Sequence, residues 1–343
     1  MFNQGSSAVW STRAIEARDI STGVDPNRII IVHGPTGVGK TEFVDALACM
    51  YPIEIINMDM GQCYLPLSIG TAKPDWQNSP TPQHLFDLFK EPTYGSVSTY
   101  RKLALEKISS IQAAGNIPVL VGGSSFYLKS LFFPPCEPVN QQVMADTGYP
   151  SDANLWQTLN AIDQKRARSI HPHDTYRIRR ALAIWYSTGL PPSSFEPPFV
   201  APAGMVSLFY LTRTTADLYN RINQRVLQMV DAGWLDEVRG LVGSAWHEFL
   251  LKKNILGYPE LFAYLAGTAD KERTIELIQQ KTRNYAKRQQ TFWRSLAAQL
   301  ADNYAGVNNA HCGYECTTIN LTDMPSHLYI DQLLDTRDTL KVV

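Results

Sequence analysis

The sequence predicts an α/β protein in which a parallel sheet is flanked by helices and carries an inserted helical domain. Short apolar segments of strand character alternate with helical segments between residues 28 and 123, which is the pattern of βαβ units. A glycine-rich loop lies between the first strand and the first helix. Proline-rich borders then enclose another helical region, so we expect a core at 28–135 and 205–301, an insertion at 136–204, and terminal extensions at 1–27 and 302–343.

The individual elements follow from the spacing of apolar residues. Continuous apolar runs predict strands at 28–34, 53–57, 117–123 and 205–213. Helical periodicity and stop signals such as Gly115 predict helices at 41–51, 99–115, 153–168, 174–188, 215–232, 259–267 and 271–301, and a further one opening after Gly123. The pattern is weak after residue 302.

Composition sets the class of protein. The 343 residues are 44% hydrophobic and 18% charged, as in an ordinary globular chain. The net charge of -1 and pI of about 6.7 give no global attraction to nucleic acid, so any such binding requires local positive charge. The five loosely spaced cysteines favour neither a disulfide framework nor a zinc site at His311, Cys312 and Cys316. Without a secretory signal or an apolar run of about 18 residues, we expect a cytoplasmic protein that does not enter a membrane.

The sequence GPTGVGKT is typical of a phosphate-binding P-loop, so the predicted fold is P-loop NTPase-like. Its glycines let the backbone wrap so that amide groups point at anionic oxygens, and Lys40 adds a positive charge. The helix that follows aims its N-terminus at the anion. Thr41 can place its hydroxyl on a Mg²⁺ ion bound to the same phosphates. The predicted binding residues are Gly34, Pro35, Thr36, Gly37, Val38, Gly39, Lys40 and Thr41.

An acidic partner for this loop is found after the second strand rather than at the end of the third. Hydrolytic P-loop proteins carry a strand-end Asp, whereas the strand at 117–123 runs into Gly122-Gly123-Ser124. Asp59 follows the strand at 53–57 and reaches the same edge of a parallel sheet. It is therefore a candidate base or metal ligand, although Asp is also a common turn residue. Lys73, in GTAKP, is a weaker candidate for a second cation.

Basic residues gather on two predicted helices. In the insertion, Arg177 and Arg180 share a face with Arg179 beside it, and on the last helix Arg283, Lys287 and Arg294 form one stripe while Lys281 and Arg288 form another. Tyr285, Phe292 and Trp293 interleave with them. Basic and stacking side chains together suit an RNA backbone and its unpaired bases, but a solvated helix face is the commoner cause of such a run. Arg221 and Arg225 lie four residues apart on another helix.

Several motifs in a fixed order make the chain resemble the tRNA dimethylallyltransferases, also called tRNA isopentenyltransferases. They cover about residues 28–300 and read GPTGVGKT, NMDMGQCY, GTAKP, HLFDL, LVGGSSFYLKSL, DTYRIRRALAIWYSTGLPPS, LYNRINQRVLQMVDAGWLDEV, LGYPELFAYLAG and QQKTRNYAKRQQTFWR. The resemblance implies transfer of a dimethylallyl group from dimethylallyl diphosphate to the exocyclic amine of the adenosine 3′ of the anticodon. It implies Mg²⁺ as cofactor, the tRNA anticodon stem-loop as partner, and we expect a monomer.

The resemblance also implies roles for individual residues. The loop Gly34–Thr41 holds the diphosphate, Arg221 contacts it, and Asp59 is the base. Gln62 reads the flipped adenine and Ser124 lies at the mouth of the site. The segments implied to contact tRNA contain Asp59, Met60, Gly61, Gln62, Ser124, Tyr176, Arg177, Ile178, Arg179, Arg180, Lys287, Arg288 and Arg294.

The chain departs from the family pattern at Met60, Gly61, Leu65 and Pro259. Loss of side chains beside Asp59 leaves open a changed acceptor or a non-catalytic RNA-binding relative. Prenylation of free AMP or ATP, as in adenylate (cytokinin-type) isopentenyltransferases, is an alternative within the same chemistry. A P-loop nucleotide kinase or ATPase is a third reading, which the missing strand-end carboxylate disfavours.

Overall fold

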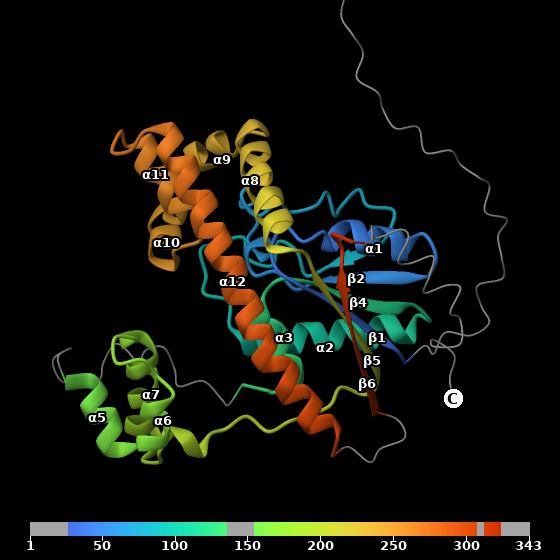
Figure 1. Ribbon diagram of the computed structural model, residues 1–343, viewed down its shortest axis with the longest axis vertical. Helices are drawn as coiled ribbons and strands as arrows, with labels where there is room; N and C mark the ends of the chain where they lie inside the picture. The colour runs from blue at the N-terminus through green and yellow to red at the C-terminus, as the bar shows by residue number, and fades with distance from the viewer. Residues whose placement is uncertain (1–26, 136–153, 307–311, 324–343) are drawn as a thin grey trace, which may run out of the picture.

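The protein is built on one six-stranded parallel sheet with the order β3-β2-β4-β1-β5-β6 (Figure 1). The computed structural model describes residues 27–135, 154–306 and 312–323. The strands are β1 (Ile29–His33), β2 (Ile53–Asn57), β3 (Gln83–His84), β4 (Ile117–Gly122), β5 (Gly204–Thr212) and β6 (Cys312–Asn320). The P-loop-like α/β fold expected from the sequence is confirmed.

Strand register brings the functional loops together. His33 at the end of β1 pairs with Gly122 of β4, and Asn57 at the end of β2 pairs with Val121. Because carboxyl ends of parallel strands meet at one edge of the sheet, the loops after β1, β2 and β4 start side by side. The glycine-rich loop, Asp59 and the Gly122-Gly123 turn are thereby placed along one edge.

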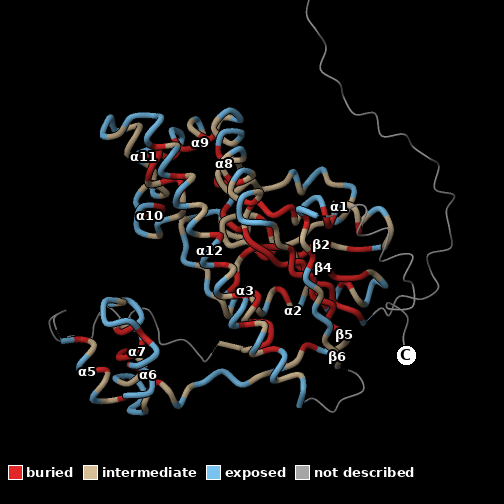
Figure 2. The backbone as a smooth tube through the Cα atoms, viewed as in Figure 1, coloured by how far each residue is buried: buried red, intermediate tan, exposed pale blue. Residues whose placement is uncertain are grey.

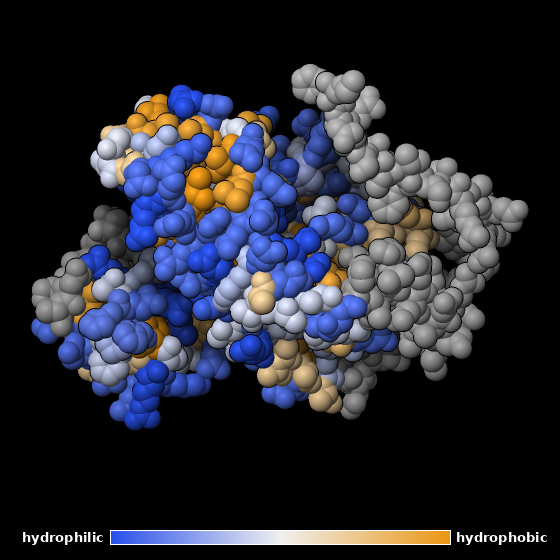
Figure 3. All heavy atoms as spheres, turned by 45° about the horizontal axis from the view of Figure 1, so that its top comes forward, coloured by the Kyte–Doolittle hydropathy of each residue, from blue (hydrophilic) through white to orange (hydrophobic). Residues whose placement is uncertain are grey.

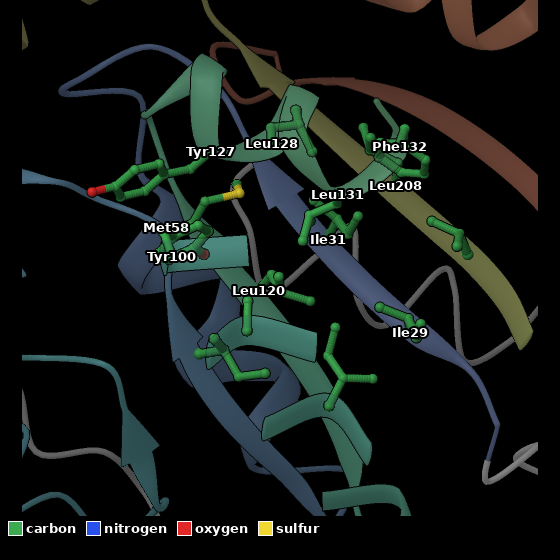
Figure 4. Close-up of a cluster of buried hydrophobic side chains, with 14 of the residues drawn as sticks. Ile29, Ile31, Met58, Tyr100, Leu120, Tyr127, Leu128, Leu131, Phe132 and Leu208 are labelled. Atoms are coloured by element: carbon green, nitrogen blue, oxygen red, sulfur yellow. The ribbon is translucent and has the colours of Figure 1, made fainter. Parts of the chain in front are cut away.

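Helices cover both faces of the sheet, as a parallel sheet requires. Alternate residues of β1 point to opposite faces: Ile29 and Ile31 pack with Leu120 against α2 and α3 (Figure 4), whereas Ile30 and Val32 pack against α1 and α8. The buried residues accordingly concentrate along the sheet (Figure 2). The covering helices are α1 (Lys40–Ala48), α2 (Val97–Ala113), α3 (Ser125–Phe132), α8 (Thr215–Asp231) and the long α12 (Lys271–Tyr304).

A second cluster of helices packs beside the sheet edge. It comprises α9 (Trp234–Leu241), α10 (Ala245–Lys253) and α11 (Tyr258–Leu265). Their buried side chains form a core with Tyr64 and Leu67 from the loop that follows Asp59. Helix α11 was predicted from the sequence, whereas α9 and α10 lie in a stretch for which no element was predicted.

The insertion folds around a small core of its own. It contains α5 (Leu155–Ile162), α6 (Gln164–Arg168) and α7 (Thr175–Thr188), and Figure 1 shows it apart from the sheet. The single helix predicted at 153–168 is two helices, because Asp163 ends α5 and caps α6. The Asp163 carboxylate accepts hydrogen bonds from the amides of Arg166 at 2.9 Å and Ser193 at 2.6 Å.

The weakly patterned region after residue 302 contributes a strand to the sheet. Cys312–Asn320 forms β6 and pairs with β5 along its whole length. The buried Arg28 donates to Ser207 of β5 and pairs with Glu315 of β6 at 3.5 Å. Such long-range pairing leaves no local signal in the sequence.

Some predictions fall on residues outside the described ranges, namely 1–26, 136–153, 307–311 and 324–343, which include His311. Within the described part of the chain, no three His, Cys, Asp or Glu side chains are grouped as a metal site. No helix in that part has the length and apolar character needed to cross a membrane.

Candidate active site

The carboxyl edge of the sheet opens into a cleft of about 1050 Å³. Residues of the glycine-rich loop line it together with Asp59, Gln62 and Arg221, which the sequence analysis predicted from separate motifs. The remaining walls include the loop around residues 68–75, the Gly122-Gly123 turn and parts of α1, α8 and α12. The structure therefore brings the predicted phosphate-binding and base residues into one cavity.

The glycine-rich loop has the backbone geometry that anion binding needs. Gly37 and Gly39 have φ angles of 78° and 112°, in the left-handed region that favours glycine. Thr36, Gly37, Gly39, Lys40 and Thr41 line the cleft, and Thr41 is exposed. By contrast, Gly34, Pro35 and Val38 are buried and absent from the cleft lining, so only their backbone can serve a ligand.

The side chain of Lys40, in the first turn of α1, folds back onto the phosphate loop. Its Nζ donates to the carbonyls of Gly34 and Pro35, both at 3.0 Å. An ammonium group has three donors, so one remains for an anion in the cleft. Burial lowers the pKa of Lys40 to about 8, and the nearby Asp59 carboxylate opposes that shift.

Asp59 is held in a tight turn after β2. Its amide donates to Asn57 Oδ1 at 2.9 Å, and its Oδ1 accepts from the amide of Gly61 at 2.9 Å. Burial raises the pKa of Asp59, while the charges of Lys40 and Arg225 favour the ionised form. A carboxylate with an elevated proton affinity in a cleft is suited to act as a general base near neutral pH.

The residues after Asp59 hold the mouth of the cleft in place. Met60 donates its amide to Ser124 Oγ at 3.0 Å. Gln62 lines the cleft and donates to the carbonyls of Thr71 and Ala72, both at 3.2 Å. Gly61 leaves no room for a side chain, because an added Cβ would lie 2.9 Å from Thr71 Cγ2.

Lys73, the second cation considered from the sequence, has a structural role. Its side chain is only 4% exposed and forms an ion pair with Asp87. It also donates to the carbonyls of Tyr64 at 2.8 Å and Leu65 at 3.1 Å. All three ammonium donors are taken by the protein, so Lys73 fixes the loop instead of offering its charge to a ligand.

Helix α8 contacts the phosphate loop and the first turn of α1 through Arg221. Arg221 Nε donates to the Gly37 carbonyl at 3.0 Å, and its Nη2 pairs with Glu42 at 2.9 Å. Arg225, one turn later, lines the same cleft, and its charge acts on both Asp59 and Lys40. The four-residue spacing of this pair is visible in the sequence, but a role was predicted for Arg221 alone. Gln289 of α12 also lines the cleft, and although it lies inside the motif QQKTRNYAKRQQTFWR, no role was predicted for it.

The predicted tRNA-binding side chains on α7 and α12 are mostly exposed, whereas Asp59, Met60, Gly61, Gln62 and Ser124 are half-buried. In α7, Tyr176 is 64% exposed and Arg177 and Arg180 are also exposed, whereas Arg179 is half-buried. Ile178 is a correction, because it is fully buried in the core of the insertion and its side chain cannot reach RNA. On α12, Lys287, Arg288 and Arg294 are exposed. Hydrophilic residues cover most of the face shown in Figure 3.

Comparison with known proteins assigns this architecture to a family. The model of the IPP transferase family matches residues 62–296. A tRNA dimethylallyltransferase of Geobacter sulfurreducens is 35% identical over 276 residues, which span 78% of this chain and 89% of the relative. One of Pseudothermotoga lettingae is 36% identical over 274 residues, spanning 78% and 86%.

The chain belongs to the IPP transferase family. Among solved structures, a tRNA isopentenylpyrophosphate transferase of Staphylococcus epidermidis is similar with a TM-score of 0.58 and 25% identity, covering 91% of this chain and 99% of that one. A eukaryotic dimethylallyltransferase acting on tRNA shares the fold, with a TM-score of 0.68 at 21% identity and coverage of 92% and 81%. This IPP transferase thus carries both its glycine-rich loop and Asp59 in the family fold, with Gly122 and Gly123 where a hydrolytic P-loop protein has an acid.

Proposed function

We propose that this IPP transferase moves a dimethylallyl group from dimethylallyl diphosphate to the exocyclic amine of the adenosine 3′ of the anticodon in tRNA. The observation that carries the proposal is one cleft lined by both an anion-binding loop and the half-buried carboxylate of Asp59. The turn after β4 offers glycines in place of the acid that ATP hydrolysis uses. The relatives named above support the same substrates.

The phosphate loop would hold the diphosphate leaving group. Breaking the bond between the prenyl carbon and the diphosphate oxygen leaves negative charge on that oxygen, and preorganised donors stabilise such charge. The loop amides, Lys40 and Arg221 are placed to do so. Thr41, an exposed residue whose side chain carries a hydroxyl, would hold a Mg²⁺ ion together with the diphosphate. When bound, the ion supplies further charge neutralisation.

Asp59 would accept the proton of the attacking amine. The adenine nitrogen is a weak nucleophile, so proton removal must accompany formation of the nitrogen–carbon bond. Burial raises the pKa of Asp59 and so favours its neutral form, whereas the charges of Lys40 and Arg225 favour the ionised form that accepts the proton. The target base must leave the anticodon-loop stack at a cost of a few kcal/mol, and Gln62, which lines the cleft, is the residue proposed to contact it.

Labelled dimethylallyl diphosphate tests the proposal when it is supplied with an anticodon stem-loop RNA or with AMP. We expect label on one adenosine of the stem-loop, identified by mass after nuclease digestion, and little on AMP. Label on AMP alone would replace the proposal with the adenylate isopentenyltransferase reading. ATP turnover without a prenyl donor, and no label on either acceptor, would indicate a P-loop ATPase. The monomeric state and cytoplasmic location accompany the proposal as predictions.

A further inference from the structure

Gln289 of α12 connects the two loops that meet at the carboxyl edge of the sheet. Its Oε1 accepts the amide hydrogen of Thr36, inside the phosphate loop, at 2.9 Å. Its Nε2 donates to the carbonyl of Gly123, in the turn after β4, at 2.8 Å. The residue is only 4% exposed and lines the cleft, so both hydrogen bonds are shielded from bulk water.

Only an amide of this length satisfies both loops. An amide carries a donor and an acceptor on one rigid group, whereas a carboxylate would place an oxygen against the Gly123 carbonyl. The fit extends to Gly123, because a Cβ added there would lie 2.4 Å from Gln289 Nε2. The glutamine and the glycine are therefore matched, and together they set the spacing between the phosphate loop and the turn that carries Ser124.

The same helix presents the exposed basic residues. Lys287 and Arg288 immediately precede Gln289 and are exposed. One turn later, Trp293 is buried and stacks on Tyr210 of β5 with ring centroids 4.6 Å apart. It also contacts His33, the residue directly before the phosphate loop, at 5.6 Å between centroids. This stretch of α12 is thus fixed to the sheet on one side and open to solvent on the other.

We infer that Gln289 is a positioning residue that couples RNA binding on the exposed side of α12 to diphosphate binding in the loop Gly34–Thr41. RNA held by Lys287 and Arg288 restrains this turn of α12, and Gln289 passes the restraint to the Thr36 amide and the Gly123 carbonyl. The inference rests on the proposed function for the identity of its two ligands. It concerns binding, so it does not depend on prenyl transfer taking place.

The test measures pyrophosphate affinity by calorimetry, with and without a saturating anticodon stem-loop. In the wild-type protein we expect the stem-loop to tighten pyrophosphate binding at least about threefold. Gln289→Met keeps the side-chain volume but loses both hydrogen bonds. It should weaken pyrophosphate about tenfold and abolish the tightening, while stem-loop affinity alone stays within twofold (~0.4 kcal/mol).

Two further variants keep the test independent of folding defects. Gly123→Ala disturbs the bridge from its other end and should reproduce the loss of coupling. Gln280→Met changes an exposed glutamine of the same helix and should leave pyrophosphate affinity unchanged. Melting curves for each protein establish that it is folded at the temperature of the titration.

Unchanged pyrophosphate affinity in folded Gln289→Met, or no effect of the stem-loop in the wild-type protein, would overturn the inference. In turnover assays the variant should raise KM for the prenyl donor about tenfold and leave KM for the stem-loop unchanged. A fall in kcat alone would indicate a structural role and also contradict it. If the stem-loop tightens pyrophosphate binding through Gln289 but the protein transfers no prenyl group, the proposed function is refuted and the inference about Gln289 is retained.

Discussion

Replacing Asp59 by asparagine should slow prenyl transfer without loosening the site. The variant side chain has the same shape, and its oxygen can still accept the Gly61 amide hydrogen that Asp59 Oδ1 accepts at 2.9 Å. The turn after β2 is therefore kept. What is lost is the one carboxylate in the cleft to which we assign proton removal from the adenine amine.

The expected size of the effect follows from that single loss. General-base catalysis contributes about 10²- to 10⁴-fold, so kcat should fall by that factor, or ~3–5 kcal/mol in activation free energy. The affinity for the donor should stay the same or increase. Lys40 and Arg225 both interact with the Asp59 charge, and without it their positive charges face the diphosphate alone.

Single-turnover transfer of label from dimethylallyl diphosphate to the stem-loop measures the chemical step directly. Asp45→Asn is the matched control, because Asp45 lines the same cleft from α1 but has no assigned part in the reaction. Its rate should match the wild type. A rate for Asp59→Asn within threefold of the wild type would refute the assignment of Asp59 as the base.

Four other outcomes follow from the structure. The pH profile of kcat/KM should be bell-shaped. Its acid limb reports ionisation of Asp59 and should lie above pH 3.8, the ordinary pKa of an Asp side chain, because burial raises the pKa of Asp59. Its alkaline limb reports deprotonation of Lys40 and should lie near pH 8, and a flat profile would contradict both assignments. Lys40→Met should raise KM for the donor roughly tenfold or more in steady-state assays. Asp163→Ala, which removes the cap of α6, should destabilise the insertion by about 1–2 kcal/mol in calorimetry and leave pyrophosphate binding intact. Gly122→Ala puts a Cβ 2.1 Å from the Met58 carbonyl and should lower the melting temperature sharply, whereas Gly240→Ala, with open space in α9, should raise it slightly.

The features predicted well from sequence are those set by local pattern and by sheet geometry. The strand at 53–57 has the predicted bounds, since a short apolar run has few alternatives. Lys40, Asp59 and Arg221 all line one cleft. For Lys40 and Asp59 this placement could be predicted, because loops that follow parallel strands lie at the same edge of the sheet. The inserted helical region was likewise visible from its proline-rich borders.

The features missed depend on contacts between distant segments. Strand β6 is specified by pairing with β5 and by the ion pair of Arg28 with Glu315, which no window of sequence contains. The two hydrogen bonds of Gln289 reach Thr36 and Gly123, more than a hundred residues away. From its motif, Lys73 was a candidate to bind an anionic ligand. In the structure its ammonium group instead pairs with Asp87 and donates hydrogen bonds to two backbone carbonyls.

Ile178 illustrates a different source of error. It was included among RNA contacts because it lies inside a motif that was carried over as a whole segment. The helical period places it with Leu182 on the buried side of α7. The neighbouring Arg177 and Arg180 point outward by the same period and remain candidates for RNA contact.

A structure of the protein with a non-reactive thiolo analogue of dimethylallyl diphosphate and an anticodon stem-loop would test the central claim most directly. The account predicts diphosphate oxygens on the amides of the loop Gly34–Thr41. It also predicts an extruded adenine whose exocyclic nitrogen lies within hydrogen-bonding distance of the Asp59 carboxylate. An adenine bound outside the cleft, or an Asp59 side chain turned away from it in the complex, would contradict the account.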